Sequence, residues 1–259
     1  MLATDGSLKN FEEGRSVDPL WTGSSDVSIL VFNPHLDEAE RLADLGYTVT
    51  ETDDTGQLTR HHLQNFNVLF IGSKTDPALY TPRRNDILNW VRRDGGGLIV
   101  AQPDRDQTEI PLFPEEFKIM VSMAQTGQYG VRIVSPEHPI FFQLEAGDLS
   151  GNFDLVRREG IGPQWQVLAV ARDDPGQVAL LAARFGSGRF LFSTGLMATP
   201  CLQPGSDRFW VQTINWAGTS PVVVETPALR PWMIFFLGLC LLLLGLRPLL
   251  RRRRSRGAD

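Results

Sequence analysis

Short apolar runs alternate with segments of helical periodicity in the first half of the chain, from residue 26 onward. Four runs that are β-branched or continuously apolar predict strands: residues 27–32, 47–51, 67–72 and 98–101. Three segments between them have apolar residues at helical spacing and predict helices: residues 34–46, 57–66 and 82–93. Strands that alternate with helices of about ten residues predict right-handed βαβ crossovers and a sheet with helices on both faces.

The second half of the chain is richer in strand patterns. Its predicted strands are residues 131–134, 166–171, 178–185 and 189–194, and its predicted helix is residues 207–217. Gly186 and Gly188 lie between the last two strands, where a tight hairpin turn needs positive φ angles. The two halves together predict one α/β domain, residues 26–218, with a doubly wound, mostly parallel sheet of flavodoxin-like type.

The C-terminal region carries a long apolar segment. Residues 231–246 contain no charged side chain, and Arg247 and four consecutive Arg at 251–254 follow. A helix over residues 231–250 would rise roughly 30 Å at about 1.5 Å per residue, which matches the hydrocarbon thickness of a bilayer. A buried core helix is the alternative, but such a helix normally has a polar stripe, which this segment lacks. We therefore expect a transmembrane helix over residues 231–250, with the lipid bilayer as a partner and residues 251–259 as a basic tail.

The segments around the domain lack a helical or strand period. Residues 1–25 mix Gly, Ser, Asp and Glu with few apolar positions, which predicts a flexible arm. Residues 219–230 would link the domain to the anchor, and the three Val at 222–224 suit either an extended linker or an edge strand.

The distribution of charge bears on partners and on orientation. The formal net charge is −5, but the segment from Arg247 holds six Arg and one Asp, so residues 1–246 carry −10. An acidic domain argues against binding nucleic acid. The basic tail predicts a cytoplasmic C-terminus and an extracytoplasmic domain. Because residues 1–10 lack an apolar stretch, that orientation requires a signal or first anchor upstream; the alternative is a tail-anchored protein that faces the cytoplasm.

Several motifs within residues 27–218 carry a resemblance to a known superfamily. In chain order they are Trp90-Val-Arg-Arg-Asp-Gly-Gly-Gly97 before the strand at 98–101, Glu137-His-Pro-Ile140, Phe185-Gly-Ser-Gly-Arg189 and Asn215-Trp-Ala-Gly218. On these residues the chain resembles the class I glutamine amidotransferase-like superfamily, and within it the trehalose-utilisation, ThuA-like branch. With the anchor and the Arg-rich tail included, it is also similar to membrane proteins with an amidotransferase-like domain and to auxiliary subunits of some ABC transporters and gliding-motility systems. That similarity implies a scaffold or sensing role beside a membrane protein partner.

The catalytic residue of the superfamily is missing from the position where the resemblance would place it. Glutamine-hydrolysing members have a nucleophilic Cys on the turn after the strand that corresponds to residues 98–101. Here the turn is Gln102-Pro-Asp-Arg-Asp106, with no thiol or hydroxyl. The ThuA-like branch tends to have His after this strand and after the hairpin strand, where this chain has Gln102 and Met197. We therefore expect a pseudoenzyme that binds a partner protein or small ligand at the carboxyl edge of the sheet.

Two sets of residues are candidates for the site. Gln102, Asp104, Arg105 and His138 would line the binding site of the non-enzymatic protein. The alternative function is a hydrolase or sugar-modifying enzyme of ThuA-like type that uses His138 with Asp104 or Cys201. His138 lies in a loop bent by two prolines, and Cys201 precedes a predicted helix whose positive end would lower its pKa.

The remaining patterns give weaker indications. Residues 53–56 and 72–75 follow predicted strands at the carboxyl edge, where α/β domains bind ligands, but 72–75 lacks the glycine spacing of a phosphate loop. Two Cys and four His at these spacings do not form a common structural zinc site, and His35, His61 and His62 are expected to be solvated. We expect no metal and no other cofactor.

Overall fold

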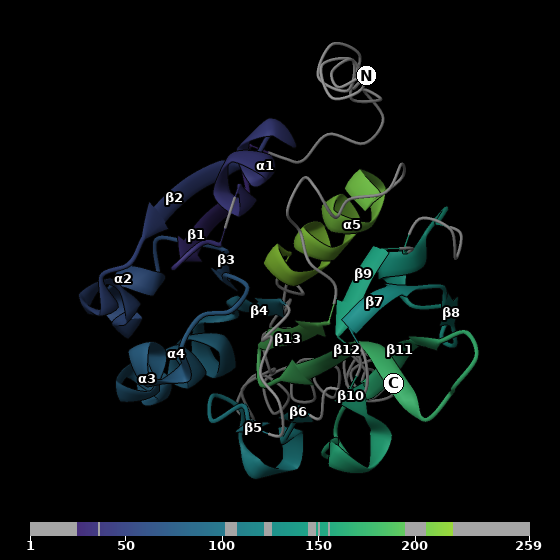
Figure 1. Cartoon of the computed structure of the whole chain (residues 1–259). Coiled ribbons are helices and arrows are strands. Elements are labelled where there is room, and N and C mark those ends of the chain that lie inside the picture. The colour runs from purple at the N-terminus through teal and green to yellow at the C-terminus, as the bar shows by residue number, and fades with distance from the viewer. Residues whose placement is uncertain are drawn as a thin grey trace, which may run out of the picture. The chain divides into compact units, whose positions relative to one another are not determined.

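Nine strands of the described chain form one mixed sheet, in the order β2-β1-β3-β4-β13-β12-β11-β8, with β10 paired to β12 (Figure 1). Their bounds are Ser28–Phe32 (β1), Thr48–Thr52 (β2), Val68–Ile71 (β3), Gly97–Ala101 (β4), Val131–Ile133 (β8), Val156–Arg157 (β10), Gln166–Ala171 (β11), Gln177–Phe185 (β12) and Gly188–Ser193 (β13). From β2 to β13 all neighbours are parallel. The expectation of a mostly parallel sheet holds only for these five strands, because the β12–β13 hairpin reverses the chain and β8, β10 and β11 then pair antiparallel.

The computed structural model describes residues 25–35, 37–101, 108–121, 126–144, 149, 151–154, 156–194 and 206–219. The chain divides into two units, Met1–Pro221 and Val222–Asp259, and all described residues belong to the first. None of the described helices is long and apolar enough to cross a membrane. Residues 231–250, the predicted anchor, lie outside the described residues, as do most of the predicted arm at 1–25 and the tail at 251–259.

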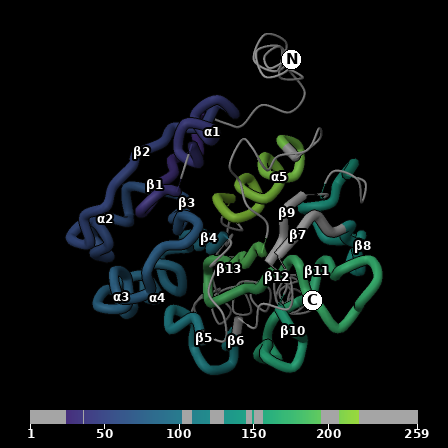
Figure 2. The backbone as a smooth tube through the Cα atoms, in the orientation of Figure 1, coloured from purple at the N-terminus to yellow at the C-terminus, as the bar shows by residue number. Residues whose placement is uncertain are grey.

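Helices cover both faces of the sheet. The α-helices are Glu38–Asp44 (α1), Arg60–Leu63 (α2), Pro77–Tyr80 (α3), Arg84–Asn89 (α4) and Ser206–Gly218 (α5). Leu42 of α1 and Ile214 of α5 belong to one buried apolar cluster, whereas Leu63 of α2 and Ile87 of α4 belong to a second cluster. Figure 2 shows the same division, with α1 and α5 on one side of the strands and α2, α3 and α4 on the other. Helices on both faces of the parallel strands confirm the α/β fold class.

One predicted helix is divided by a local cap, and another is confirmed as a continuous helical segment whose hydrogen-bond pattern changes along its length. Residues 57–66 form a 3₁₀-helix, η2 (Thr55–Leu58), and then α2, because Thr59 is extended and caps α2 instead of continuing the first helix. Residues 82–93 form the end of η3 (Thr81–Arg83), then α4, and then a π-helical turn, η4 (Trp90–Asp94). Gly95 ends this turn with φ of 83°, a left-handed conformation that suits glycine.

The smaller elements lie outside the main sheet. Strands β5 (Thr108–Glu109) and β6 (Met120–Val121) form one antiparallel pair, and β7 (Thr126–Tyr129) and β9 (Gly151–Asp154) form another. The remaining described 3₁₀-helices are η5 (Glu115–Phe117), η6 (Pro139–Phe141) and η8 (Arg158–Gly160).

Candidate functional site

The point where the sheet changes its winding direction lies between β1 and β3. These strands are parallel neighbours, and the helices that follow them, α1 after β1 and α3 and α4 after β3, pack on opposite faces. The two connections diverge at the carboxyl ends of the strands, and open α/β sheets generally bind ligands at such points. We call residues 33–35, Glu38 and residues 72–75 the switch-point site.

A buried carboxylate ties the two loops of the switch-point site together. Glu38 opens α1 and is fully buried, and Ser73 is 1 % exposed. The Ser73 backbone N–H donates to the Glu38 carboxylate at 3.1 and 3.2 Å, and the Ser73 hydroxyl donates to it as well. The His35 N–H is a further donor, at 2.8 Å. These hydrogen bonds join the loop after β1 to the loop after β3.

The backbone of both loops is held in sparsely populated conformations. Asn33 has φ of 50° and Lys74 has φ of 60°, in the left-handed region that few residues other than glycine adopt. Between them Gly72 leaves no room for a side chain, because a Cβ there would lie 2.3 Å from the Asn33 carbonyl oxygen. The Thr75 hydroxyl donates to the Gly72 carbonyl at 2.6 Å and accepts from the Asn33 amide at 3.3 Å. Strained backbone that surrounding bonds hold in place is frequent at ligand sites.

Burial sets the electrostatics of this site. Removal of the Glu38 carboxyl from water raises its pKa, and the hydrogen bonds from Ser73 and His35 oppose that shift. Because Glu38 is fully buried, it cannot meet a ligand directly. It can hold the loops so that the exposed Lys74 and the half-buried Asn33 and His35 present their polar groups at the edge of the sheet.

Most of the sequence-predicted site residues fall outside the described chain. Gln102, Asp104 and Arg105 lie in the segment 102–107, which follows the end of β4, and Cys201 lies in the segment 195–205, which leads into α5.

His138 is described, and it lies at the other end of the sheet. Its ring is 5.0 Å from the ring of Trp216, in the last turns of α5, and its Nδ1 accepts the Ile140 N–H at 3.4 Å as the cap of η6. The Trp216 ring also lies under Arg189, which pairs with Gly97 at the start of β4. Since residues 102–107 follow the opposite end of β4, this geometry gives no support to a single pocket shared by His138 and that segment.

The pKa of His138 is lowered to about 4 by burial, and the positive charges of Arg189 and Arg184 contribute. A neutral imidazole of such low basicity is a poor general base near neutral pH.

A pH dependence of stability follows from the lowered pKa. Above pH 6.5 the imidazole is neutral in the folded and unfolded chain; as the pH falls towards 4, only the unfolded chain takes up the proton. The contribution of His138 to the free energy of unfolding is therefore fully present above pH 6.5. As the pH falls to about 4, the free energy of unfolding decreases by about 3 kcal/mol for this reason. We expect His138→Asn, which can still cap η6, to flatten this part of the curve of unfolding free energy against pH. Parallel curves for the two proteins would contradict the prediction.

The other histidines and acids do not assemble a metal centre in the described part of the chain, where no group of three His, Cys, Asp or Glu lies close enough to hold an ion. His61 is exposed, the His62 ring lies 5.4 Å from that of Phe66, and the His35 N–H is engaged by Glu38.

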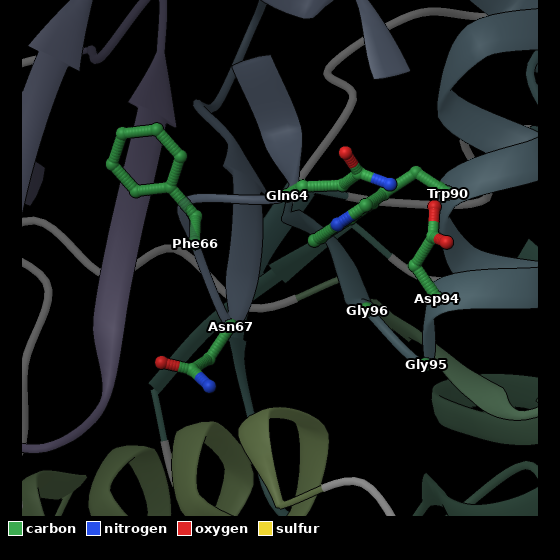
Figure 3. A pocket seen from close by; sticks show the side chains of 7 residues that line it. All are labelled: Gln64, Phe66, Asn67, Trp90, Asp94, Gly95 and Gly96. Atoms are coloured by element: carbon green, nitrogen blue, oxygen red, sulfur yellow. The ribbon is translucent and has the colours of Figure 1, made fainter. Parts of the chain in front are cut away.

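A small hollow lies at the amino ends of β3 and β4, away from the switch-point site. Its volume is about 170 Å³, and it is lined by Gln64, Phe66, Asn67, Trp90, Asp94, Gly95 and Gly96. Figure 3 shows Gln64, Trp90 and Asp94 on one side of it and Asn67 on the other. Arg60 binds both oxygens of Asp94 at 2.7 Å, which lowers the pKa of that carboxyl. The only charged group of the lining is thus already neutralised.

Comparisons with known proteins bear on the fold. No protein-family model and no curated protein matches the sequence. Among solved structures, a protein described as ThuA-like from Bacteroides uniformis is 13 % identical, with a TM-score of 0.54 over 79 % of this chain and 95 % of its own. Two cytoplasmic proteins of Salmonella typhimurium are each 12 % identical and match 74 % of this chain, with TM-scores of 0.53 and 0.54 over 98 % and 99 % of their own lengths. The domain therefore has a fold similar to that of a ThuA-like protein, which agrees with the amidotransferase-like fold inferred from the sequence.

The sequence pattern does not single out Glu38, the residue at the centre of the switch-point site. Glu38 lies among Asp37 and Glu40 in an acidic first helical turn, which is common and does not distinguish a buried carboxylate from solvated ones. The sequence pattern predicts that segment 72–75, which follows a strand, lies at the carboxyl edge, and the structure places it there.

Proposed function

We propose that this chain is a non-enzymatic, membrane-anchored domain of amidotransferase-like fold that binds a partner protein or a small ligand at the switch-point site. Membrane anchoring rests on the apolar segment 231–250 and the Arg-rich tail. In the cell the domain would serve as an accessory to a membrane complex. Residues 102–105 follow β4, the neighbour of β3, and would extend the same edge with Gln102, Asp104 and Arg105.

The observation that carries the proposal is that hydrogen bonds to the Glu38 carboxylate join the loop after β1 to the loop after β3. Glu38 is buried where it cannot react, yet it holds two loops whose backbone includes left-handed Asn33 and Lys74. The turn after β4 has the sequence Gln102-Pro-Asp-Arg-Asp106, without a thiol or hydroxyl nucleophile. Loops held in one conformation by hydrogen bonds, beside a turn after β4 that has no thiol or hydroxyl, are suited to binding rather than to group transfer.

The test places a photo-reactive amino acid at Lys74 in the full chain, expressed in cells of its source. We expect the protein to sediment with membranes and, after illumination, to form one defined adduct: a crosslinked protein, or a small mass added at position 74. The matched control has the photo-reactive amino acid in place of Asn65, which is exposed at the amino end of β3. This variant should give no such adduct.

Three outcomes would count against the proposal. Equal crosslinking from positions 74 and 65 would mean that the switch-point site is not the binding edge. Steady glutamine hydrolysis by the purified chain, or its recovery in the soluble fraction without detergent, would contradict the non-enzymatic or the anchored part respectively.

A further inference from the structure

Two arginines face each other at the amino edge of the sheet, on the side covered by α5. Arg184 of β12 and Arg189 of β13 are directly opposite in the register of the hairpin. Their neighbours two residues along each strand, Ala182 and Leu191, lie in the apolar cluster that includes α5. Like charges at directly opposite positions of an antiparallel pair repel each other.

Arg189 is an unusual buried cation. It is 7 % exposed, and its Nη1 donates to the Trp216 carbonyl and, at 3.2 Å, to the Thr219 hydroxyl. Its guanidinium lies 5.0 Å from the centre of the Trp216 ring. Within the described residues its Nε is buried without a hydrogen-bond partner.

The carbonyl groups at the end of α5 offset only part of this charge. A helix C-terminus carries roughly half of a negative charge, whereas burying a full cation without an ionic partner is costly. Neither Arg184 nor Arg189 forms an ion pair with a carboxylate of the described residues. The exposed Arg184 opens this cluster to solvent.

We propose that Arg184 and Arg189 form a binding site for a phosphate group, with Trp216 and His138 beside it. Guanidinium groups present paired N–H donors that match phosphate oxygens, and two of them can share one dianion. An anion there would cancel the repulsion between the two arginines and supply the ionic partner that Arg189 lacks among the described residues. The phosphate could belong to a free metabolite or to an acidic lipid headgroup. This site lies at the opposite edge from the switch-point site, so it stands independently of the proposed function.

His138 provides a second signature of binding. Burial and three charged groups set its charge state: burial and the charges of Arg189 and Arg184 disfavour the protonated imidazole, whereas the Glu137 carboxylate favours it. A bound phosphate would counter the two arginines and raise the pKa of His138, which a structural role for Arg189 alone would not do.

The experiment titrates inorganic phosphate into the full chain, purified in a neutral detergent, and follows heat release and the His138 NMR signal against pH. We expect saturable binding, an upward shift of the His138 pKa, and roughly tenfold or greater weakening in Arg184→Gln. Arg132→Gln, which removes another exposed arginine, on β8, should bind phosphate like the wild type. Arg184 is exposed, so its replacement should leave the fold intact.

A second arm separates the two sources of phosphate. Nanodiscs of phosphatidylcholine alone are compared with nanodiscs that contain phosphatidic acid. An Arg184-dependent shift of the His138 signal only with phosphatidic acid assigns the site to a lipid headgroup, and a shift only with inorganic phosphate assigns it to a soluble compound. Absence of saturable binding in both arms, or equal binding by wild type and Arg184→Gln, overturns the proposal.

Discussion

Replacement of Glu38 by alanine is expected to lower the free energy of unfolding by about 3 to 5 kcal/mol. The Glu38 carboxylate accepts hydrogen bonds from the Ser73 N–H, the Ser73 hydroxyl and the His35 N–H. Since Ser73 is buried, alanine would leave its donors without a partner and away from water, and each such donor costs about 1 to 3 kcal/mol. Chemical denaturation of the two proteins followed by circular dichroism measures the difference.

Two variants distinguish this role from a general effect of charge on α1. Glu40→Ala, on the exposed side of the same helical turn, should change the free energy of unfolding by no more than about 0.5 kcal/mol. Glu38→Gln keeps one acceptor oxygen, and the Ser73 hydroxyl can rotate to accept from the amide, so its loss should be smaller than that of alanine. If Glu38→Ala were as mild as Glu40→Ala, the carboxylate would not be what holds the two loops together.

Substitution of Gly188 by alanine is expected to destabilise the protein by about 3 kcal/mol. A Cβ at Gly188 would lie 2.3 Å from the carbonyl oxygens of both Gly96 and Val91. These are backbone atoms of the π-helical turn and of the residue just before β4, so they cannot move aside as a flexible side chain could. Thermal or chemical unfolding measures the effect.

Ser187→Ala in the same turn is the control for this substitution. Ser187 donates its backbone N–H to the Arg92 carbonyl at 2.9 Å, and alanine retains that bond. The control should lie within about 0.5 kcal/mol of the wild type. Equal stability of the two variants would show that the π-helical turn adjusts to the extra methyl group.

The two glycines of this hairpin show what a sequence pattern can predict and what it cannot. The pattern predicts that both serve a turn with positive φ, and Gly186, with φ of 62°, confirms this. Gly188 is not among the described glycines with positive φ, so the prediction is wrong for it. It is glycine because another part of the backbone passes against it. A local sequence signal reports local conformation, but it carries no information about which distant segment comes into contact.

The same distinction applies to the candidate site. The sequence indicated that residues 72–75 lie at the carboxyl edge, since that follows from the order of strands and helices. It grouped His138 with the segment after β4, whereas η6 packs along α5 and brings His138 to Trp216 at the other edge. Glu38 could not be recognised, because an acidic residue in a first helical turn is favourable whether it is buried or solvated.

The amino-acid sequence by itself determined the α/β class, the positions of the main strands and the apolar C-terminal segment, because hydrophobic periodicity and run length act over a few neighbouring residues. Only the tertiary structure decided the reversal of the sheet after β13, the burial of Glu38 and the juxtaposition of Arg184 and Arg189. These features depend on strand pairing and helix packing between residues far apart in the chain, where many arrangements satisfy the same local pattern and the packing of the whole domain selects one.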